Sequence, residues 1–393
     1  MVPSSWIHTT FEKHIDCLTG YAFKSSNYSD SSSDIKLLRG DNIEPGSLRW
    51  RDAKYWSINQ LDGLERYQLN KGDFVIALDR TWISSGLKVA EVRSEDLPCL
   101  LVQRVIRVRA KKTLEQGLLR QYFSGHKFEQ YVKSVQTATA VPHISPNDIK
   151  EFPLLLPPLA EQQKIAQILS TWDQAISTTE KLLENSQQQK KALMQQLLTG
   201  KKRLLDERGN LFQSKFKSSA LKELFSINKG QQLNRDTLSS QGNYAVINGG
   251  IEPSGYTDVY NVESNTITIS EGGNSCGYVG FQELPFWCGG HCYALSNYRL
   301  HIGFTYQLLK FNERQIMRLR VGSGLPNIQK KDLECLMISY PNCAFEQAKI
   351  AEVLSIADQC IETLQKKLDS LKQEKKALMQ QLLTGKKRVK VAA

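Results

Sequence analysis

Lys190-Lys-Ala-Leu-Met-Gln-Gln-Leu-Leu-Thr-Gly-Lys-Lys-Arg203 returns without a single change as Lys375 to Arg388, 185 positions (375 − 190) further along this 393-residue chain. The likeness extends toward the N-terminus at the same offset, because the stretch that starts Glu161-Gln-Gln-Lys-Ile-Ala resembles the one that starts Glu346-Gln-Ala-Lys-Ile-Ala. One ungapped repeat therefore covers 161–203 and again 346–388. Two distant copies indicate a duplicated half-molecule, whereas a solenoid would show adjacent copies.

Both copies carry apolar residues at alternating steps of four and three, which is the heptad pattern of a coiled-coil seam. Gly200 and Gly385 follow the last seam leucine, where a helix commonly ends in the left-handed conformation. The pattern predicts a helix over about 159–199 and a second one at the same offset. The predicted seam consists of Ile165, Leu169, Trp172, Ile176, Leu183, Leu193 and Leu197 in the first copy, and of Ile350, Leu354, Ile361, Leu364, Leu368, Leu371, Leu378 and Leu382 in the second.

A helix of about 38 residues is roughly 57 Å long and cannot bury its seam alone. We therefore expect the two helices to pack on each other as a coiled coil. An antiparallel pair with a pseudo-two-fold axis is favoured, because a parallel pair would force the intervening segment to bridge the length of a helix. The alternative is that each helix packs only on its own globular segment, but the seam is long and regular for that role.

The composition is that of a folded protein with a polyanionic partner. Hydrophobic residues make up 40% and charged residues 23% of the chain, as in ordinary globular proteins. The net charge of +11 favours nucleic acid as that partner. The chain has no apolar run long enough to span a membrane and no secretory signal pattern at its start. Eight scattered cysteines favour reduced thiols and a cytoplasmic location.

Two β-rich globular segments accompany the helices, so we predict an α+β fold. Strand-like runs occur at 73–78, 100–109, 244–247 and 265–270, and a helical run at 113–123. In the second run Val105, Arg107 and Arg109 share one face. The globular segments do not align with each other beyond their ends, which indicates that they have diverged. The predicted domains are a globular domain at 1–156, a helix at 157–203, a connector with a second globular domain at 204–341, and a helix with a basic tail at 342–393.

The sequence lacks the common motifs of catalysis and cofactor binding. The chain has no phosphate-binding loop with the Gly-x-x-x-x-Gly-Lys-Ser/Thr pattern and no Asn/Asp-Pro-Pro-aromatic motif of amino-methyltransferases. Cys276, Cys288, His291 and Cys292 lack the paired Cys-x-x-Cys spacing of zinc knuckles. We therefore predict no catalytic residue, no metal site and no cofactor in this chain.

The two copies of the repeat resemble the conserved regions of type I restriction–modification specificity subunits. The motifs that carry this resemblance are Pro-Pro-Leu-Ala-Glu-Gln-Gln-Lys-Ile-Ala-Gln-Ile-Leu, which begins at Pro157, and the string that ends at Arg203, with their second copies. The second copy departs at its entry, where Tyr340-Pro-Asn-Cys-Ala-Phe stands in place of Pro-Pro-Leu. The resemblance covers essentially the whole chain, including two variable segments in the corresponding places.

The resemblance implies that each globular segment is a target recognition domain that reads one half of a split double-stranded DNA sequence. It implies that the helices act as a spacer and dock two methyltransferase subunits, which hold S-adenosylmethionine. Motor-nuclease restriction subunits, which use ATP and Mg²⁺, complete the family's assemblies. In that reading this chain is a non-catalytic specificity subunit.

DNA contacts are expected from polar side chains in loops of the two globular domains, since phosphate contacts position a duplex and base-edge contacts specify its sequence. For each such residue the alternative is a solvated surface charge. Four tryptophans, Trp50, Trp56, Trp82 and Trp287, are expected in the core. The DNA-contact candidates are Arg39, Asn42, Arg49, Arg51, Lys54, Arg80 and Lys88 in the first domain, and Lys229, Gln231, Gln232, Asn234, Arg235, Asn274 and Arg299 in the second.

Two other functions compete with this reading. The first is an architectural DNA-binding tether that works without a methyltransferase partner. The second is a self-contained methyltransferase or nuclease, which the missing motifs disfavour. Co-purification separates the leading reading from the tether, because only a specificity subunit should bring two large partners with it.

Overall fold

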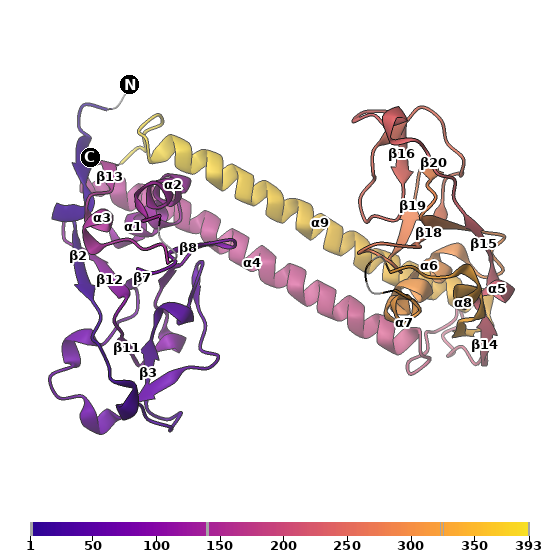
Figure 1. Ribbon diagram of the computed structural model, residues 1–393, viewed down its shortest axis with the longest axis horizontal. Helices are drawn as coiled ribbons and strands as arrows, with labels where there is room; N and C mark the ends of the chain where they lie inside the picture. The colour runs from indigo at the N-terminus through magenta and orange to yellow at the C-terminus, as the bar shows by residue number, and fades with distance from the viewer. Residues whose placement is uncertain (1–2, 139–140, 323, 325, 392–393) are drawn as a thin grey trace. The chain divides into compact units, whose positions relative to one another are not determined.

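The computed structural model describes residues 3–138, 141–322, 324 and 326–391. The chain forms two compact units, one made of Met1–Thr178 with Leu368–Ala393 and the other of Thr179–Lys367 (Figure 1). We call them unit 1 and unit 2. Two long helices, α4 (Leu159–Leu197) and α9 (Ala344–Leu382), each begin in one unit and end in the other.

Unit 1 contains a four-stranded antiparallel sheet and a smaller three-stranded sheet, with apolar side chains buried between them. A two-stranded sheet adjoins the start of α4. The first sheet has the order β10 (Val89–Glu91), β7 (Phe74–Ala77), β12 (Val105–Ala110), β2 (Ile15–Thr19). The second has the order β11 (Cys99–Leu101), β3 (Ile35–Leu38), β6 (Lys54–Trp56), and the third pairs β1 (Ile7–Thr10) with β13 (Pro153–Leu156).

Short hairpins and helices complete unit 1. The hairpins are β4 (Ile43–Glu44) with β5 (Ser47–Leu48) and β8 (Trp82–Ile83) with β9 (Gly86–Leu87). The α-helices are α1 (Gln116–Phe123), α2 (His126–Val135) and α3 (Pro146–Lys150). The 3₁₀ turns are η1 (Phe11–Lys13), η2 (Ser25–Asn27), η3 (Gly40–Asn42), η4 (Ile58–Gln60), η5 (Glu65–Tyr67) and η6 (Ser94–Asp96).

Unit 2 repeats the same architecture. Its four-stranded sheet has the order β15 (Ser226–Lys229), β21 (Cys292–Ser296), β18 (Thr266–Ser270), β19 (Val279–Gln282). Its other sheets are β17 (Tyr256–Thr257), β16 (Tyr244–Ile247), β20 (Phe286–Cys288), and β14 (Phe216–Ala220) with β22 (Met337–Pro341). The short helices are α5 (Leu221–Leu224), α6 (Ile302–Phe311), α7 (Glu313–Arg318), α8 (Lys330–Cys335) and the 3₁₀ turn η7 (Arg235–Thr237).

The shared topology extends to the direction of the strands. Strand β3 pairs with β11 in parallel and with β6 in antiparallel orientation, and β16 pairs in the same way with β20 and β17. The globular segments therefore share one fold although their sequences do not align by eye. The sequence did not predict this likeness. Topology depends on turns and on the alternation of buried and exposed residues, and both can be kept without residue identity.

The long helices pack antiparallel within each unit. In unit 1, Glu161 near the start of α4 binds Arg388 beyond the end of α9, while Asp173, further along α4, binds Lys375, earlier in α9 (Nζ–Oδ1 2.5 Å). Unit 2 repeats both contacts, with Arg203 bound to Glu346 (2.6 Å) and Lys190 bound to Asp358 (2.5 Å). Contacts that run in opposite directions along the two helices confirm the antiparallel expectation.

Every predicted seam residue is buried or half-buried, and the large exposed side chains on the helices lie elsewhere. The two ends of the seam also complete the globular cores. Ile165 and Leu169 join the core of unit 1 together with Leu382, and Leu197 joins the core of unit 2 with Ile350. The seam thus contacts both the facing helix and the domains, so packing on a domain alone, the alternative considered from the sequence, is not what the structure shows.

Two expectations from the sequence need correction. The run 100–109 is not one strand, because Arg104 adopts a left-handed φ of 66° and separates β11 from β12, which lie in different sheets. Among the four tryptophans expected in the core, only Trp56 is buried; Trp50, Trp82 and Trp287 are half-buried. The indole nitrogen of Trp50 donates to Asp96 (2.7 Å), which lets that ring stay near the surface.

None of the helices in the described part of the chain is both long enough and apolar enough to cross a membrane.

Candidate nucleic-acid interface

A tight turn follows β3 in unit 1 and gathers several of the predicted DNA contacts. Asn42 closes this turn from inside: its side-chain oxygen accepts a hydrogen bond from the backbone of Arg39 (3.0 Å), and its amide donates to the carbonyl of Arg49 (3.0 Å). The side chain is buried, with 2% of the residue exposed. The prediction that Asn42 contacts DNA is therefore wrong, because both of its polar groups hold the protein backbone.

Lys88 lies beneath the same turn. A β-carbon built on Gly40 would lie 4.0 Å from the Lys88 ammonium nitrogen. Lys88 is 9% exposed, and burial lowers its pKa, with the charges of Asp41 and Arg80 acting on it in opposite directions. The buried position of Lys88 does not suit the predicted contact with DNA.

Four more candidates of unit 1 reach the surface, whereas Arg39 is half-buried and its Nε is buried. Arg49 is half exposed and pairs with Glu44 (3.3 Å), while Arg51 is 82% exposed in its side chain. Arg80 is exposed on a residue with a left-handed φ of 47°, and Lys54 is exposed on β6. These residues are available to a ligand, and Arg49 and Arg80 are among the charges that act on Lys88.

In unit 2 the segment after β15 gathers four of the predicted residues, Lys229, Gln231, Gln232 and Asn234. All four are exposed. The Lys229 ammonium donates to buried Glu271 (2.7 Å), which also accepts from the Tyr293 hydroxyl (3.1 Å).

The other candidates of unit 2 are more dispersed. Gln232 lines a cavity of about 390 Å³ together with Asn248 and Gly289. Asn274 is exposed in the turn that begins at Glu271. Arg299 is exposed elsewhere, where its backbone nitrogen donates to Leu224 (2.8 Å). The side chain of Arg235 lies outside the described part of the chain.

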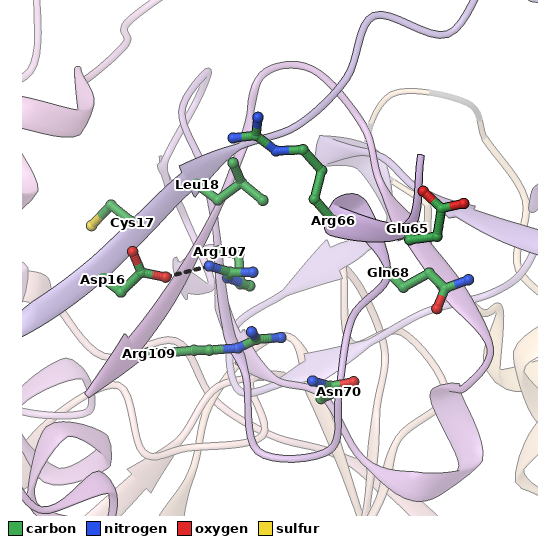
Figure 2. Close-up of a pocket in the computed structure, with 9 residues that line it drawn as sticks. All are labelled: Asp16, Cys17, Leu18, Glu65, Arg66, Gln68, Asn70, Arg107 and Arg109. Atoms are coloured by element: carbon green, nitrogen blue, oxygen red, sulfur yellow. Dashed lines mark hydrogen bonds and ion pairs between the residues drawn. The ribbon is translucent and has the colours of Figure 1, made fainter. Parts of the chain in front are cut away.

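A second cavity, of about 450 Å³, lies in unit 1 among residues that the sequence did not single out as DNA contacts (Figure 2). We call it the β2–β12 cleft. Strands β2 and β12 form its floor, and the segment Glu65–Asn70 forms its rim. Its lining residues are Asp16, Cys17, Leu18, Glu65, Arg66, Gln68, Asn70, Arg107 and Arg109.

Two ion pairs hold Arg107 and Arg109, two of the three arginines of this cleft. Arg109 donates a bidentate pair of hydrogen bonds to buried Asp73 (Nη2–Oδ2 2.7 Å). These hydrogen bonds raise the pKa of the Arg109 guanidinium. Arg107 donates from Nη2 to Asp16. Burial raises the pKa of the neighbouring Cys17 thiol to about 11, so this cysteine is un-ionised at neutral pH. The alternation of arginines in the sequence indicated their shared face, but only the fold places the rim segment opposite them.

The described residues contain no group of three or more His, Cys, Asp or Glu side chains arranged to hold a metal ion. Cys276, Cys288 and Cys292 are buried free thiols. A hydrogen bond with Cys288, together with burial, raises the pKa of Cys292.

The family model for the type I restriction modification DNA specificity domain matches residues 33–186 and 213–373, which is most of the chain and includes most of both units. The chain belongs to the type I restriction–modification DNA specificity family. The two matched segments each contain most of one globular fold and most of the long helix that follows it, so the family's repeat agrees with the duplication of this specificity protein.

Curated relatives match parts of the chain. The specificity subunit of the type I restriction enzyme EcoAI from Escherichia coli is 34% identical over 182 residues, which is 46% of this chain and 30% of that protein. A putative type I specificity subunit of Mycoplasma genitalium is 37% identical over 144 residues, which is 36% of this chain and 37% of that protein. The chain thus spans about a third of the length of these curated relatives.

A solved structure supports the fold. The crystal structure of a type I restriction–modification S subunit from M. genitalium superposes with a TM-score of 0.71 at 19% identity, covering 97% of this chain and 96% of that one. At this identity the likeness shows the fold of the specificity protein and not its DNA target.

Proposed function

We propose that the protein is the DNA specificity subunit of a type I restriction–modification complex, in which each globular domain reads one half of a bipartite target. The proposal rests on one observation: the two globular domains share a topology but carry different residues in corresponding loops. The turn after β3 presents Arg39 and Gly40, whereas the turn after the corresponding strand β16 presents Asn248 and Gly249. A shared scaffold with different loops suits two readers of different sequences.

We further propose that the long helices set the spacing between half-sites and dock two methyltransferase subunits. The outward surfaces of the repeats support two equal docking sites. Lys191, Ala192, Gln195 and Gln196 are exposed on α4, and the same residue types at Lys376, Ala377, Gln380 and Gln381 are exposed on α9. Packing between the helices does not require exposed residues to be identical, so their identity is consistent with a second copy of the same partner.

In this proposal the chain itself performs no chemistry. S-adenosylmethionine belongs to the methyltransferase subunits, and ATP with Mg²⁺ belongs to motor-nuclease restriction subunits that join the same complex in the cytoplasm. The role of this chain is to bind the duplex at two places and thereby to determine which adenine the methyltransferase subunit methylates. Its positive charge of +11 suits that role, because affinity for a duplex arises largely from contacts to phosphates.

The proposal is tested by reconstitution. The purified chain alone should transfer no methyl group to DNA. When it is mixed with the methyltransferase subunit encoded beside it, sequencing of the methylated bases should show one bipartite motif. Methylation by the chain alone would refute the non-catalytic role. The architectural tether remains the competing function, and it would be favoured if no methyltransferase subunit co-purified.

A further inference from the structure

The β2–β12 cleft of unit 1 has the chemistry of a base reader. We propose that it binds the major-groove edge of a purine in one half of the DNA target, with Gln68 and Asn70 as specificity-determining residues at its rim and Arg107 on its floor. This inference rests on the proposed function and adds to it residues that the sequence did not single out as readers.

The rim carries two exposed amide side chains, those of Gln68 and Asn70 (Figure 2). Gln68 and Asn70 alternate with Leu69, which is buried in the core between the two sheets of unit 1. Both amides are exposed, and within the described part of the chain neither side chain binds another residue.

The floor presents donors that the protein does not use. The Arg107 side chain is 8% exposed, so nine-tenths of it is buried. Its Nη2 binds Asp16, but its Nε is buried and has no hydrogen-bond partner among the described residues. A buried donor without a partner is costly, and a ligand with acceptor atoms would satisfy the free donors of this guanidinium. Figure 2 shows Arg107 between β2 and the rim segment.

The charge balance of the cleft argues for a base edge and against a phosphate. Arg66, Arg107 and Arg109 are offset by Asp16, Glu65 and, behind Arg109, Asp73. A phosphate would meet two carboxylates in a cleft with no net positive charge. A base edge is uncharged and offers both donors and acceptors, as the amides and carboxylates of this cleft require. Amide side chains pair with adenine and guanidinium groups with guanine, and both use the purine N7.

The experiment uses the full chain in complex with its methyltransferase subunit. Gln68→Ala, Asn70→Ala and Arg107→Gln are compared with Gln60→Ala, which removes an exposed amide outside the cleft. The methylated sites of each complex are sequenced. We expect discrimination at one or two positions of a single half-site to fall about tenfold in the cleft variants, while the other half-site stays unchanged. Urea denaturation of each variant beside the wild type reports whether unit 1 is still folded, because the second half-site reports only on unit 2.

A second measurement identifies the atom that is read. Duplexes in which one purine of that half-site is replaced by its 7-deaza analogue lack N7 at that position. The wild-type complex should lose about tenfold in affinity at the relaxed position, and the cleft variants should lose little more. A uniform loss of binding with an unchanged motif would indicate a phosphate contact and overturn the inference, as would an unchanged motif at full affinity. A wild-type complex with no bipartite motif would instead refute the proposed function.

Discussion

Asp173 and Asp358 link the pair of long helices to the globular domains. Each carboxylate accepts one hydrogen bond from a lysine of the other long helix and a second from a buried glutamine of the adjacent globular domain. Gln121 donates to Asp173 (2.7 Å), and Gln307 donates to Asp358 (2.8 Å). Lys190 and Lys375 thus each carry a charge whose partner is fixed on the facing helix.

Loss of one of these lysines should destabilise its unit. Lys375→Ala leaves Asp173 with its glutamine alone, and we expect the free energy of unfolding to fall by about 2 kcal/mol, because a hydrogen bond between charged groups is lost. Lys376→Ala, the exposed neighbour on the same helix, is the matched control. Urea denaturation of both variants checks the prediction, which fails if the two unfold at the same midpoint.

The buried imidazole of His14 should make unit 1 sensitive to acid. Its Nδ1 lies 2.8 Å from the Thr113 hydroxyl, and its Nε2 lies 3.2 Å from that of Thr9. Burial, with Lys111 and Lys13 nearby, lowers the pKa of His14 below 6.5. The unfolded chain therefore takes up a proton first as the pH falls through 6.5, and the folded state loses stability. Denaturation at pH 8 and pH 5.5 should show a smaller acid loss for His14→Gln than for the wild type.

At the scale of elements, a glycine follows the end of each long helix. The two glycines have the same sequence around them in the repeat, but different residues pack against them. Gly200 and Gly385 both adopt the left-handed conformation, with φ of 72° and 71°. A β-carbon on Gly200 would lie 2.8 Å from the Phe216 ring, and one on Gly385 would lie 2.6 Å from Pro3. The same end of the repeat is thus covered by a strand residue in unit 2 and by the N-terminal segment in unit 1.

Gly200→Ala should cost more than a left-handed conformation alone. Gly209 is a suitable control, because it is also left-handed (φ 79°) but has nothing within 4 Å of an added β-carbon. Alanine at either position costs about 1 kcal/mol of backbone strain, and at Gly200 the contact with Phe216 should add about 1–3 kcal/mol. Thermal unfolding of the two variants measures the difference; equal losses would show that Phe216 gives way.

The elements that could be predicted are those whose signal is local. The heptads of α4 and α9 and the alternation at 105–109 are periodic, so the helices and the arginine face follow from spacing. The break at Arg104 and the buried amide of Asn42 do not, because each depends on a turn that only the folded chain defines. The β2–β12 cleft was missed as a site for the same reason: its rim and floor are far apart in the sequence.

At the scale of the whole molecule, the repeat predicted the duplication but not the likeness of the two globular folds. Helix copies keep their residues because each must match a facing helix, whereas sheets of one topology tolerate any residues that alternate correctly between core and surface. The repeated glutamine near the start of each helix has a different role, because it binds the segment that precedes its own helix. Gln162 and Gln347 bind the backbone of their own domains in the same way, through Pro157 and Pro341.

The proposed spacing role leads to a prediction for the complete complex. Insertion of four residues in each long helix would lengthen each by about 6 Å. At roughly 3.4 Å per base pair, the gap between the half-sites of the methylated motif should grow by one or two base pairs. The half-site sequences themselves should not change. An unaltered gap in the sequenced methylome would show that the helices do not set it.

The crossed ion pairs constrain how this gene can change. Lys190 binds Asp358 and Lys375 binds Asp173, so the partner of each residue lies in the other copy of the repeat. A substitution at one of these four residues therefore has to be compensated at its partner in the other copy of the repeat. A different globular domain would leave these ion pairs intact, but it would have to supply its own glutamine to Asp173 or Asp358 and pack its core on the same helix ends.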